Sequence, residues 1–366
     1  MATVKRSPNG KKWRVRWYDP EGNERAKDFD LKRDANRHAA DMEASKARGT
    51  YIDPHDRTTV IEYARLWAAS RPHNARTARK MASTLKNHIE GTPLGARRLA
   101  VVLPSEAQGW ATGRSKVLAP KTLRVLVDTV SSIFRAAVRD RKIPSNPFLG
   151  LSLPEAHQER IVPLSVNQVR QLADAAPEYA RAMVITQAGL GLRIGELMAL
   201  RAEDLNFLKR TARVETQLPP GEKERDDPKT KLSKRTLPMP QFVVDALAAH
   251  MAAYPPLDDG SIFYNTRGNL WETSHLGKMF ARWVKAAGLP EGTTSHDLRH
   301  HYASVLLYAG ESVIAVAERL GHKNANLVLS TYGHLLPDSE ERTRKALDVA
   351  WSDADQVRTS GSSKAV

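Results

Sequence analysis

The stretch Thr294-Ser295-His296-Asp297-Leu298-Arg299-His300 decides the fold expected for this chain of 366 residues. His296 is expected near the start of a helix, and Arg299 follows one turn later on the same face. Free backbone N–H groups at a helix start favour anions, and a histidine and an arginine beside them add further donors. The stretch therefore predicts a helix whose beginning forms a phosphate pocket.

Two other interpretations of this stretch remain open. His296 and His300 are four residues apart, as in helices that bind zinc. Against a metal, Arg299 would stand beside the cation, no glutamate follows His296 as a general base, and no third ligand is obvious. The other alternative is a pair of neutral histidines that cap the helix. We predict no metal and no cofactor.

A second informative stretch runs from Gly189 to Leu197 and reads Gly-Leu-Gly-Leu-Arg-Ile-Gly-Glu-Leu. It predicts two apolar helices joined by a glycine-rich turn. Arg193 lies in this apolar context, where a guanidinium is costly unless it meets an anion. A salt bridge with Glu196, three residues later, is the structural alternative.

A third pair of motifs lies near the carboxy end. Gly321, in Leu320-Gly321-His322, is typical of a helix C-cap and would place His322 just beyond the helix. Tyr332 follows ten residues later in Ser330-Thr331-Tyr332-Gly333-His334, on a short helical stretch that starts near Asn326. A lone tyrosine is usually a core or surface residue, so these motifs gain meaning only together with the first two.

Taken together, the motifs resemble the active-site series of the tyrosine recombinases of the phage-integrase kind. The resemblance covers residues 160–350 and assigns catalytic roles to Arg193, His296, Arg299, His322 and Tyr332, with Tyr332 as the nucleophile. It also implies a lysine on a hairpin before a basic-x-x-Pro strand, here Arg235-Thr236-Leu237-Pro238. Lys229 is the first choice for that lysine and Lys231 the alternate.

The rest of the chain predicts a mainly α fold with small β-sheets, an α+β class in several domains. In residues 13–18, Trp13, Val15 and Trp17 alternate with polar residues at strand period. We expect an N-terminal three-stranded sheet plus a helix over Leu31–Arg48, then a helical bundle that includes Thr59–Ala69, Thr77–His88 and Lys121–Arg141. A mixed helical domain with a small sheet follows.

The resemblance divides the chain into functional domains of the arm-binding, three-domain type. It implies an arm-type DNA-binding domain at 1–56, a core-site DNA-binding helical domain at 57–155 and a catalytic domain at 156–351. Residues 352–366 are expected to form a flexible tail.

The placement of the net charge of +15 supports a polyanionic partner. Residues 1–50 hold 13 Lys/Arg against 8 Asp/Glu and residues 58–155 hold 16 against 6, whereas residues 156–366 are nearly balanced at 26 against 25. DNA would gain affinity at the basic part through counterion release. The side chains predicted to contact it are Arg14, Arg16, Arg124, Arg135 and Lys231.

The resemblance implies an enzyme that cleaves and rejoins DNA through a 3′-phosphotyrosyl intermediate, so that a mobile element is integrated or excised. Its partners would be double-stranded attachment sites, a homotetramer on DNA, a host DNA-bending factor and an excisionase. A type IB topoisomerase and a non-catalytic DNA-binding regulator are the alternatives. The chain has no cysteine, no apolar run of membrane length and no secretory signal, which together favour a cytoplasmic protein.

Overall fold

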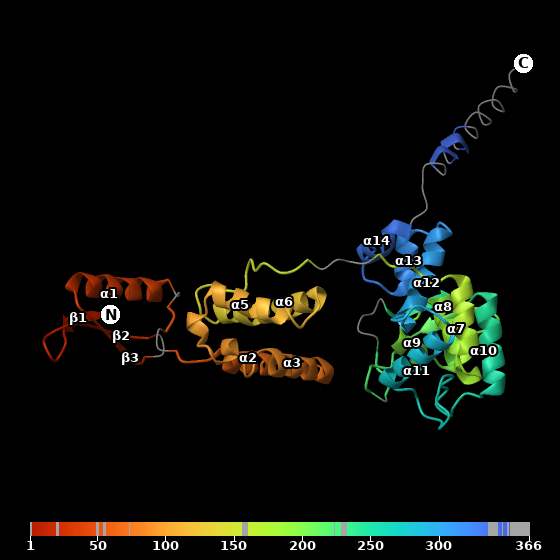
Figure 1. Ribbon diagram of the computed structural model, residues 1–366, viewed down its shortest axis with the longest axis horizontal. Coiled ribbons are helices and arrows are strands. Elements are labelled where there is room, and N and C mark those ends of the chain that lie inside the picture. The colour runs from red at the N-terminus through yellow and green to blue at the C-terminus, as the bar shows by residue number, and fades with distance from the viewer. Residues whose placement is uncertain are drawn as a thin grey trace, which may run out of the picture. The chain divides into compact units, whose positions relative to one another are not determined.

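The computed structural model describes residues 2–19, 22–48, 51–53, 56–72, 74–155, 160–222, 224–227, 233–335, 343–345, 347–349 and 351. The chain divides into two compact units, residues 1–158 and 159–366. Most of the described residues are helical, and two three-stranded antiparallel sheets accompany the helices (Figure 1). The predicted fold class is therefore confirmed. The functional domain boundaries stay a prediction, and the predicted tail at 352–366 lies outside the described residues.

The N-terminal sheet contains strands β1 (Thr3–Arg6), β2 (Trp13–Tyr18) and β3 (Glu24–Phe29), with β2 in the centre. Helix α1 (Lys32–Ala47) packs along it (Figure 1). Val15 and Trp17 are buried beneath the helix, and the Trp17 indole N–H donates to the Tyr51 hydroxyl at 2.9 Å. The alternation in β2 thus turns its apolar residues toward the helix and its arginines away from it.

A helical bundle completes the first unit. Its elements are α2 (Val60–Ala69), α3 (Ala75–His88), α4 (Pro93–Ala96), the short 3-10 helix η1 (Leu99–Val101), α5 (Pro104–Ser115) and α6 (Pro120–Arg139). Buried apolar side chains of α6 line one face, whereas Arg124 and Arg135 are exposed. Helix α6 ends two residues before the predicted Arg141, because Arg141 adopts a left-handed backbone conformation at φ 56°.

The second unit is built around helix α8 (Glu178–Leu190), most of whose residues are buried. The other helices are α7 (Val166–Ala175), α9 (Ile194–Ala199), η2 (Ala202–Asp204), α10 (Gln241–Ala253), α11 (Thr273–Ala286), α12 (Ser295–Tyr308), α13 (Val313–Leu320), α14 (Asn326–Tyr332) and η4 (Gly333–Leu335). Helix α8 packs against α7, α10 and α12 (Figure 1). A small sheet pairs β5 (Thr211–Val214) with β4 (Leu205–Asn206) and β6 (Arg235–Pro238).

Two glycines end the helices that matter for the site. Gly191 closes α8 at φ 63° and Gly321 closes α13 at φ 64°, in the left-handed conformation that glycine adopts without a Cβ penalty. A Cβ at Gly191 would also lie 2.3 Å from the ring of Tyr302. Both helices therefore end sharply and leave their last carbonyl groups without intrahelical partners. Across the described residues, no helix combines the length and apolarity needed to span a bilayer.

Candidate active site

Helix α12 begins where the sequence predicts a helix start, and a cap of Thr294 and Asp297 holds its first turn. The backbone N–H and hydroxyl of Thr294 donate to the Asp297 carboxylate at 2.7 and 2.8 Å. This cap places His296 in the first turn, where part of its surface stays exposed to solvent, and buries Arg299 to 1% exposure. His296 thus lies where the site is open to solvent, and Arg299 lies in its interior.

The buried guanidinium of Arg299 is held by the ends of two other helices. Its Nη1 donates to the Gly191 carbonyl at 2.7 Å, and its Nη2 donates to the Leu320 carbonyl at 2.5 Å. Carbonyls at helix C-termini lack intrahelical partners and carry partial negative charge. Burial, and then the charge of Arg193, lower the pKa of Arg299 to about 9, so the side chain stays cationic at neutral pH.

Arg193 reaches the same place from the N-cap of α9. Its Nη1 is 2.8 Å from Oε1 of Glu196, and its Nη2 donates to the Gly321 carbonyl at 3.2 Å. The predicted ion pair with Glu196 is therefore present. Gly321 follows Leu320, so Arg193 and Arg299 bind consecutive carbonyls of one chain segment and their positive charges converge at the end of α13.

The carboxylate of Glu196 has a second cationic partner that the sequence did not identify. Arg235, the first residue of β6, places Nη2 2.9 Å from Oε2 and Nη1 3.2 Å from Oε1. Burial raises the pKa of Glu196, but hydrogen bonding and attraction from Arg235 more than offset it, and the pKa falls below its usual range. The only feature of the sequence that pointed to Arg235 was its position as the basic residue of the basic-x-x-Pro strand.

His322 stands directly beyond the Gly321 cap, as the sequence predicted. Its backbone N–H donates to the Ala317 carbonyl at 2.9 Å, whereas its Nδ1 is buried and has no hydrogen-bond partner among the described residues. Burial, followed by the charges of Arg299 and Arg193, lowers the pKa of His322 to about 4. The ring is therefore neutral at pH 7, and it lies close enough to two guanidinium groups for their charges to act on it.

Tyr332 is the last residue of α14 and is 3% exposed. Its hydroxyl lies 2.6 Å from Nδ1 of His300. Burial raises the pKa of Tyr332 to about 12, although the charge of Arg299 acts in the opposite direction. His296 completes the group, because its ring packs edge-on against His300 with centroids 4.7 Å apart. Burial and the cations Arg299 and Arg193 lower the pKa of His296 as well.

The structure thus brings five predicted residues together: Arg193, His296, Arg299, His322 and Tyr332. Lys229 and Lys231 lie outside the described residues, and their roles stay predictions. The sequence did not identify His300 as a partner of Tyr332. The signal that could have found it was its i, i+4 spacing from His296, which had instead suggested a metal.

The predicted DNA-contacting arginines differ in their surroundings. Arg14 donates two hydrogen bonds to Asp28 across the sheet, at 2.7 and 2.8 Å, and Arg16 pairs with Glu24 at 3.4 Å. Arg124 and Arg135 are exposed on α6, and among the described residues neither forms an ion pair. The α6 arginines are therefore free to meet phosphate without breaking an existing bond.

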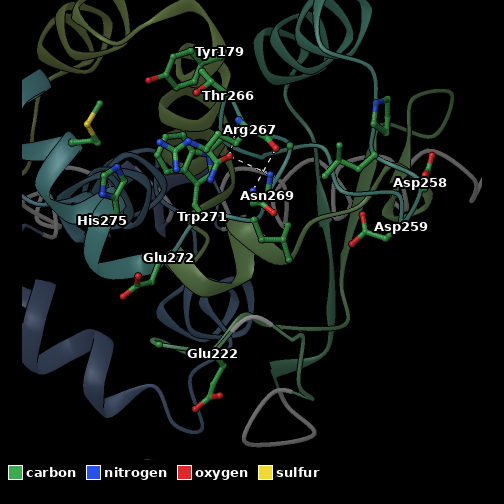
Figure 2. A pocket seen from close by; sticks show the side chains of 17 residues that line it. Tyr179, Glu222, Asp258, Asp259, Thr266, Arg267, Asn269, Trp271, Glu272 and His275 are labelled. Carbon is green, nitrogen blue, oxygen red and sulfur yellow. Dashed lines mark hydrogen bonds between the residues drawn. The ribbon is translucent and has the colours of Figure 1, made fainter.

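A large cavity elsewhere in the second unit contains none of the predicted catalytic residues (Figure 2). Tyr179, Trp271 and His275 stack along it, with successive ring centroids 6.0 and 5.9 Å apart. Among the described residues, no group of three or more histidine or acidic side chains is arranged to hold a metal ion. The converging cations, rather than the cavity, therefore mark the candidate active site.

Comparison with known proteins agrees with this geometry. Residues 163–338 match the profile of the Phage integrase family. A tyrosine recombinase XerC-like protein of Caldanaerobacter subterraneus subsp. tengcongensis is 26% identical over 314 residues, which cover 75% of this chain and 79% of that protein. An integrase of Mycobacterium phage FRAT1 is 25% identical over 80% of this chain and 89% of its own length.

Two solved structures share the fold. The Tn1549 transposon integrase, solved in complex with a circular intermediate DNA, aligns with a TM-score of 0.70 and 26% identity over 79% of this chain and 99% of that chain. A lambda integrase tetramer bound to a Holliday junction aligns with a TM-score of 0.60 and 20% identity over 88% of this chain and 96% of its own. Residues 163–338 thus match the phage integrase family, and over most of its length the chain is similar to tyrosine recombinases and integrases.

Proposed function

We propose that this protein is an integrase that cuts DNA with Tyr332 and holds the cut strand as a 3′-phosphotyrosyl ester before rejoining it. As a site-specific recombinase of its family, the protein breaks and rejoins DNA strands. One observation supports the residue assignment above all others: Arg193 and Arg299 bind the consecutive carbonyls of Gly321 and Leu320, directly before His322.

The two arginines supply the charge that the reaction needs. Attack at phosphorus builds negative charge on the non-bridging oxygens, and guanidinium groups donate paired hydrogen bonds to such oxygens. Arg299 is fixed by two helix ends, whereas the side chain of Arg193 is 39% exposed and faces solvent in part. We assign Arg299 to the floor of the phosphate site and Arg193 to its open side.

The neutral histidines complete the site. Nδ1 of His322 has no partner in the described part of the chain, and His296 stands at the helix start where an anion is favoured. Each can donate a hydrogen bond to the phosphate or move a proton. When the Tyr332 oxygen bonds to phosphorus, the bond to the 5′ oxygen breaks, and Lys229 is our candidate to protonate that oxygen, with Lys231 as the alternate.

The substrates proposed are double-stranded attachment sites. Two neighbours in the comparison were solved with DNA, one of them as a tetramer on a Holliday junction. We extend this to the present chain as a homotetramer acting on two sites, with the arm-type domain at 1–56 and the core-site domain at 57–155 holding the DNA. A host DNA-bending factor and an excisionase would set the direction, and the mobile element would be a phage or an integrative plasmid.

A covalent-adduct assay tests the proposal. The protein is incubated with a nicked attachment site, taken from the genomic junctions beside the gene, and resolved on a denaturing gel. Wild-type protein should form a DNA adduct that survives denaturation, and Tyr332→Phe should bind the same DNA without forming it. Tyr308→Phe is the matched control, because Tyr308 is 77% exposed on α12. An adduct from Tyr332→Phe would overturn the assignment.

A further inference from the structure

The hydroxyl of Tyr332 already has a partner that can take its proton, provided that the neutral ring carries its own proton on Nε2. Its oxygen lies 2.6 Å from Nδ1 of His300, with the ring centroids 5.5 Å apart and the planes at 62°. This is a short, direct hydrogen bond between the atom that would attack phosphorus and an imidazole nitrogen. His300 is not one of the residues that the family resemblance assigned to catalysis.

Two helices create this contact. His300 lies in the second turn of α12, one turn after His296, and Tyr332 is the last residue of α14. The η4 turn that follows Tyr332 packs against α12. This packing places Tyr332 next to the face of α12 that carries His296 and His300. His300 therefore meets the hydroxyl because of the helix packing, and no mobile loop is needed.

The other two histidines of the site are less suited to this task. Among the described residues, neither His296 nor His322 forms a hydrogen bond with Tyr332. The charges of Arg299 and Arg193 act on the ring of His322, and the ring of His296 packs on His300. Both therefore remain available to the phosphate, whereas His300 is engaged with the nucleophile.

We propose that His300 is the general base that accepts the proton from the Tyr332 hydroxyl when that oxygen attacks phosphorus. This inference rests on the proposed function, in which Tyr332 is the nucleophile. In cleavage, the proton moves from Tyr332 to Nδ1 of His300, the oxygen–phosphorus bond forms, and the bond to the 5′ oxygen breaks. In rejoining, a 5′-hydroxyl attacks phosphorus and gives its proton to the lysine that protonated the 5′ oxygen in cleavage, and His300 returns its proton to the departing phenolic oxygen.

The charges around the pair fit this role. The charged and titratable groups that act on His300 are Asp297 and Arg299 from its own helix, together with the ring of His296 and the Tyr332 hydroxyl from α14. Burial lowers the pKa of His300, so its ring is neutral and able to accept a proton at pH 7. Burial also raises the pKa of Tyr332 to about 12, so the phenol needs an acceptor.

The decisive variant is His300→Asn, which keeps a hydrogen-bond acceptor near the position of Nδ1 but cannot take up a proton at neutral pH. Single-turnover cleavage is measured from pH 5 to 9 on a nicked site with an ordinary 5′ oxygen and on one with sulfur at that position. We expect the variant to lose about 10²- to 10⁴-fold in rate at pH 7, the usual contribution of a general base.

The pH profile separates proton transfer from positioning. Wild-type protein should show a rate that rises with pH and levels off once His300 is deprotonated, whereas His300→Asn should keep rising with hydroxide. His334→Asn is the matched control: its exposed ring lies two residues after Tyr332, bonds to the Ile161 carbonyl and should keep the wild-type limb. Sulfur at the 5′ position should not rescue His300→Asn, because a thiolate leaves without a proton but does not activate the phenol.

A second arm tests the same idea from the side of the nucleophile. Replacing Tyr332 with a fluorinated tyrosine of lower phenolic pKa should restore part of the rate lost in His300→Asn. Three results would overturn the role of His300. They are a wild-type pH profile in His300→Asn, rescue of that variant by the sulfur substrate, and no gain in its rate from fluorotyrosine. If wild-type protein forms no adduct through Tyr332, the proposed function itself fails, and the two failures are thus distinguishable.

Discussion

The guanidinium of Arg235 faces the carboxylate of Glu196 with two contacts of 2.9 and 3.2 Å, and the two side chains are only 8% and 2% exposed. Glu196 also binds Arg193, so one buried carboxylate balances two cations. Arg235 further donates to the Arg319 and Ser233 carbonyls. The pair thus connects β6, α9 and the end of α13 beneath the candidate phosphate site.

The first prediction concerns this carboxylate. Glu196→Gln leaves Arg193 and Arg235 without their shared counter-charge, and breaking a buried ion pair typically costs about 3–5 kcal/mol. We expect a corresponding loss in the free energy of unfolding, measured by urea denaturation, and slower adduct formation because Arg193 loses its orientation. Glu203→Gln is the control, since Glu203 pairs with Arg201 at the surface and should change stability by less than about 1 kcal/mol. Equal effects in the two variants would contradict the prediction.

The second prediction separates the two arginines of the site. Arg193→Ala should lower the rate of adduct formation by about 10²- to 10³-fold, the typical loss for one transition-state donor, and should destabilise the fold less than Arg299→Ala, because only one carbonyl loses its donor and Glu196 keeps Arg235. Arg299→Ala should lower the rate at least as much and also destabilise the fold, because the buried carbonyls of Gly191 and Leu320 lose their donor, at about 1–3 kcal/mol each. Denaturation and single-turnover cleavage of both variants check this contrast.

Much of the site's framework could be predicted because it depends on local patterns. The cap of α12 requires only Thr294 and Asp297, and the end of α13 requires only Gly321, so the sequence places His296 and His322 at helix ends. The mainly helical class likewise follows from apolar periodicity.

The contacts that the sequence did not reveal are long-range. Arg235 is 39 residues from Glu196, and His300 is 32 residues from Tyr332. Each contact depends on how whole helices and strands pack, and no spacing along the chain encodes that packing. The observed helix boundaries differ from the predicted ones by one or two residues. At the end of α6 the difference arises because the left-handed conformation of Arg141 has no strong signal in the local sequence.

The third prediction concerns DNA binding by the basic first unit. Arg135→Ala should lower the slope of log affinity against log salt by about one, because one exposed cation no longer releases counterions from DNA. Arg14→Ala should lower it less, since Arg14 already donates two hydrogen bonds to the Asp28 carboxylate, which balances its charge. Titrations at several salt concentrations measure the slopes. A larger effect for Arg14 would place the DNA on the N-terminal sheet instead of α6.

The fourth prediction distinguishes the two candidate lysines. If Lys229 protonates the departing 5′ oxygen, Lys229→Ala should cleave an ordinary site slowly and a site with 5′ sulfur at nearly the wild-type rate, because a thiolate leaves without a proton. Lys231→Ala should cleave both substrates like wild-type protein. The reverse pattern would assign the role to Lys231, and equal rescue of both would leave neither as the sole proton donor.

The fifth prediction follows from buried neutral histidines. The pKa of His322 in the folded chain is lowered to about 4, mainly by burial, and the pKa values of His250 and His301 are lowered for the same reason. In the unfolded chain these rings have a pKa of about 6.5. As pH falls below that value, the unfolded chain binds protons at these histidines and the folded chain does not. Their contribution to the free energy of unfolding is therefore fully present above about pH 6.5 and is lost toward pH 4.

The measurement is the melting temperature between pH 7.5 and 5. Over this range carboxylates contribute little, because Asp and Glu side chains in the unfolded chain titrate near pH 4. We therefore expect the melting temperature to fall as pH drops, and His322→Gln, which removes one titrating ring, to shrink that fall. A pH dependence identical in His322→Gln and wild-type protein would mean that the His322 ring titrates equally in both states, and that the cations of Arg193 and Arg299 do not converge on it.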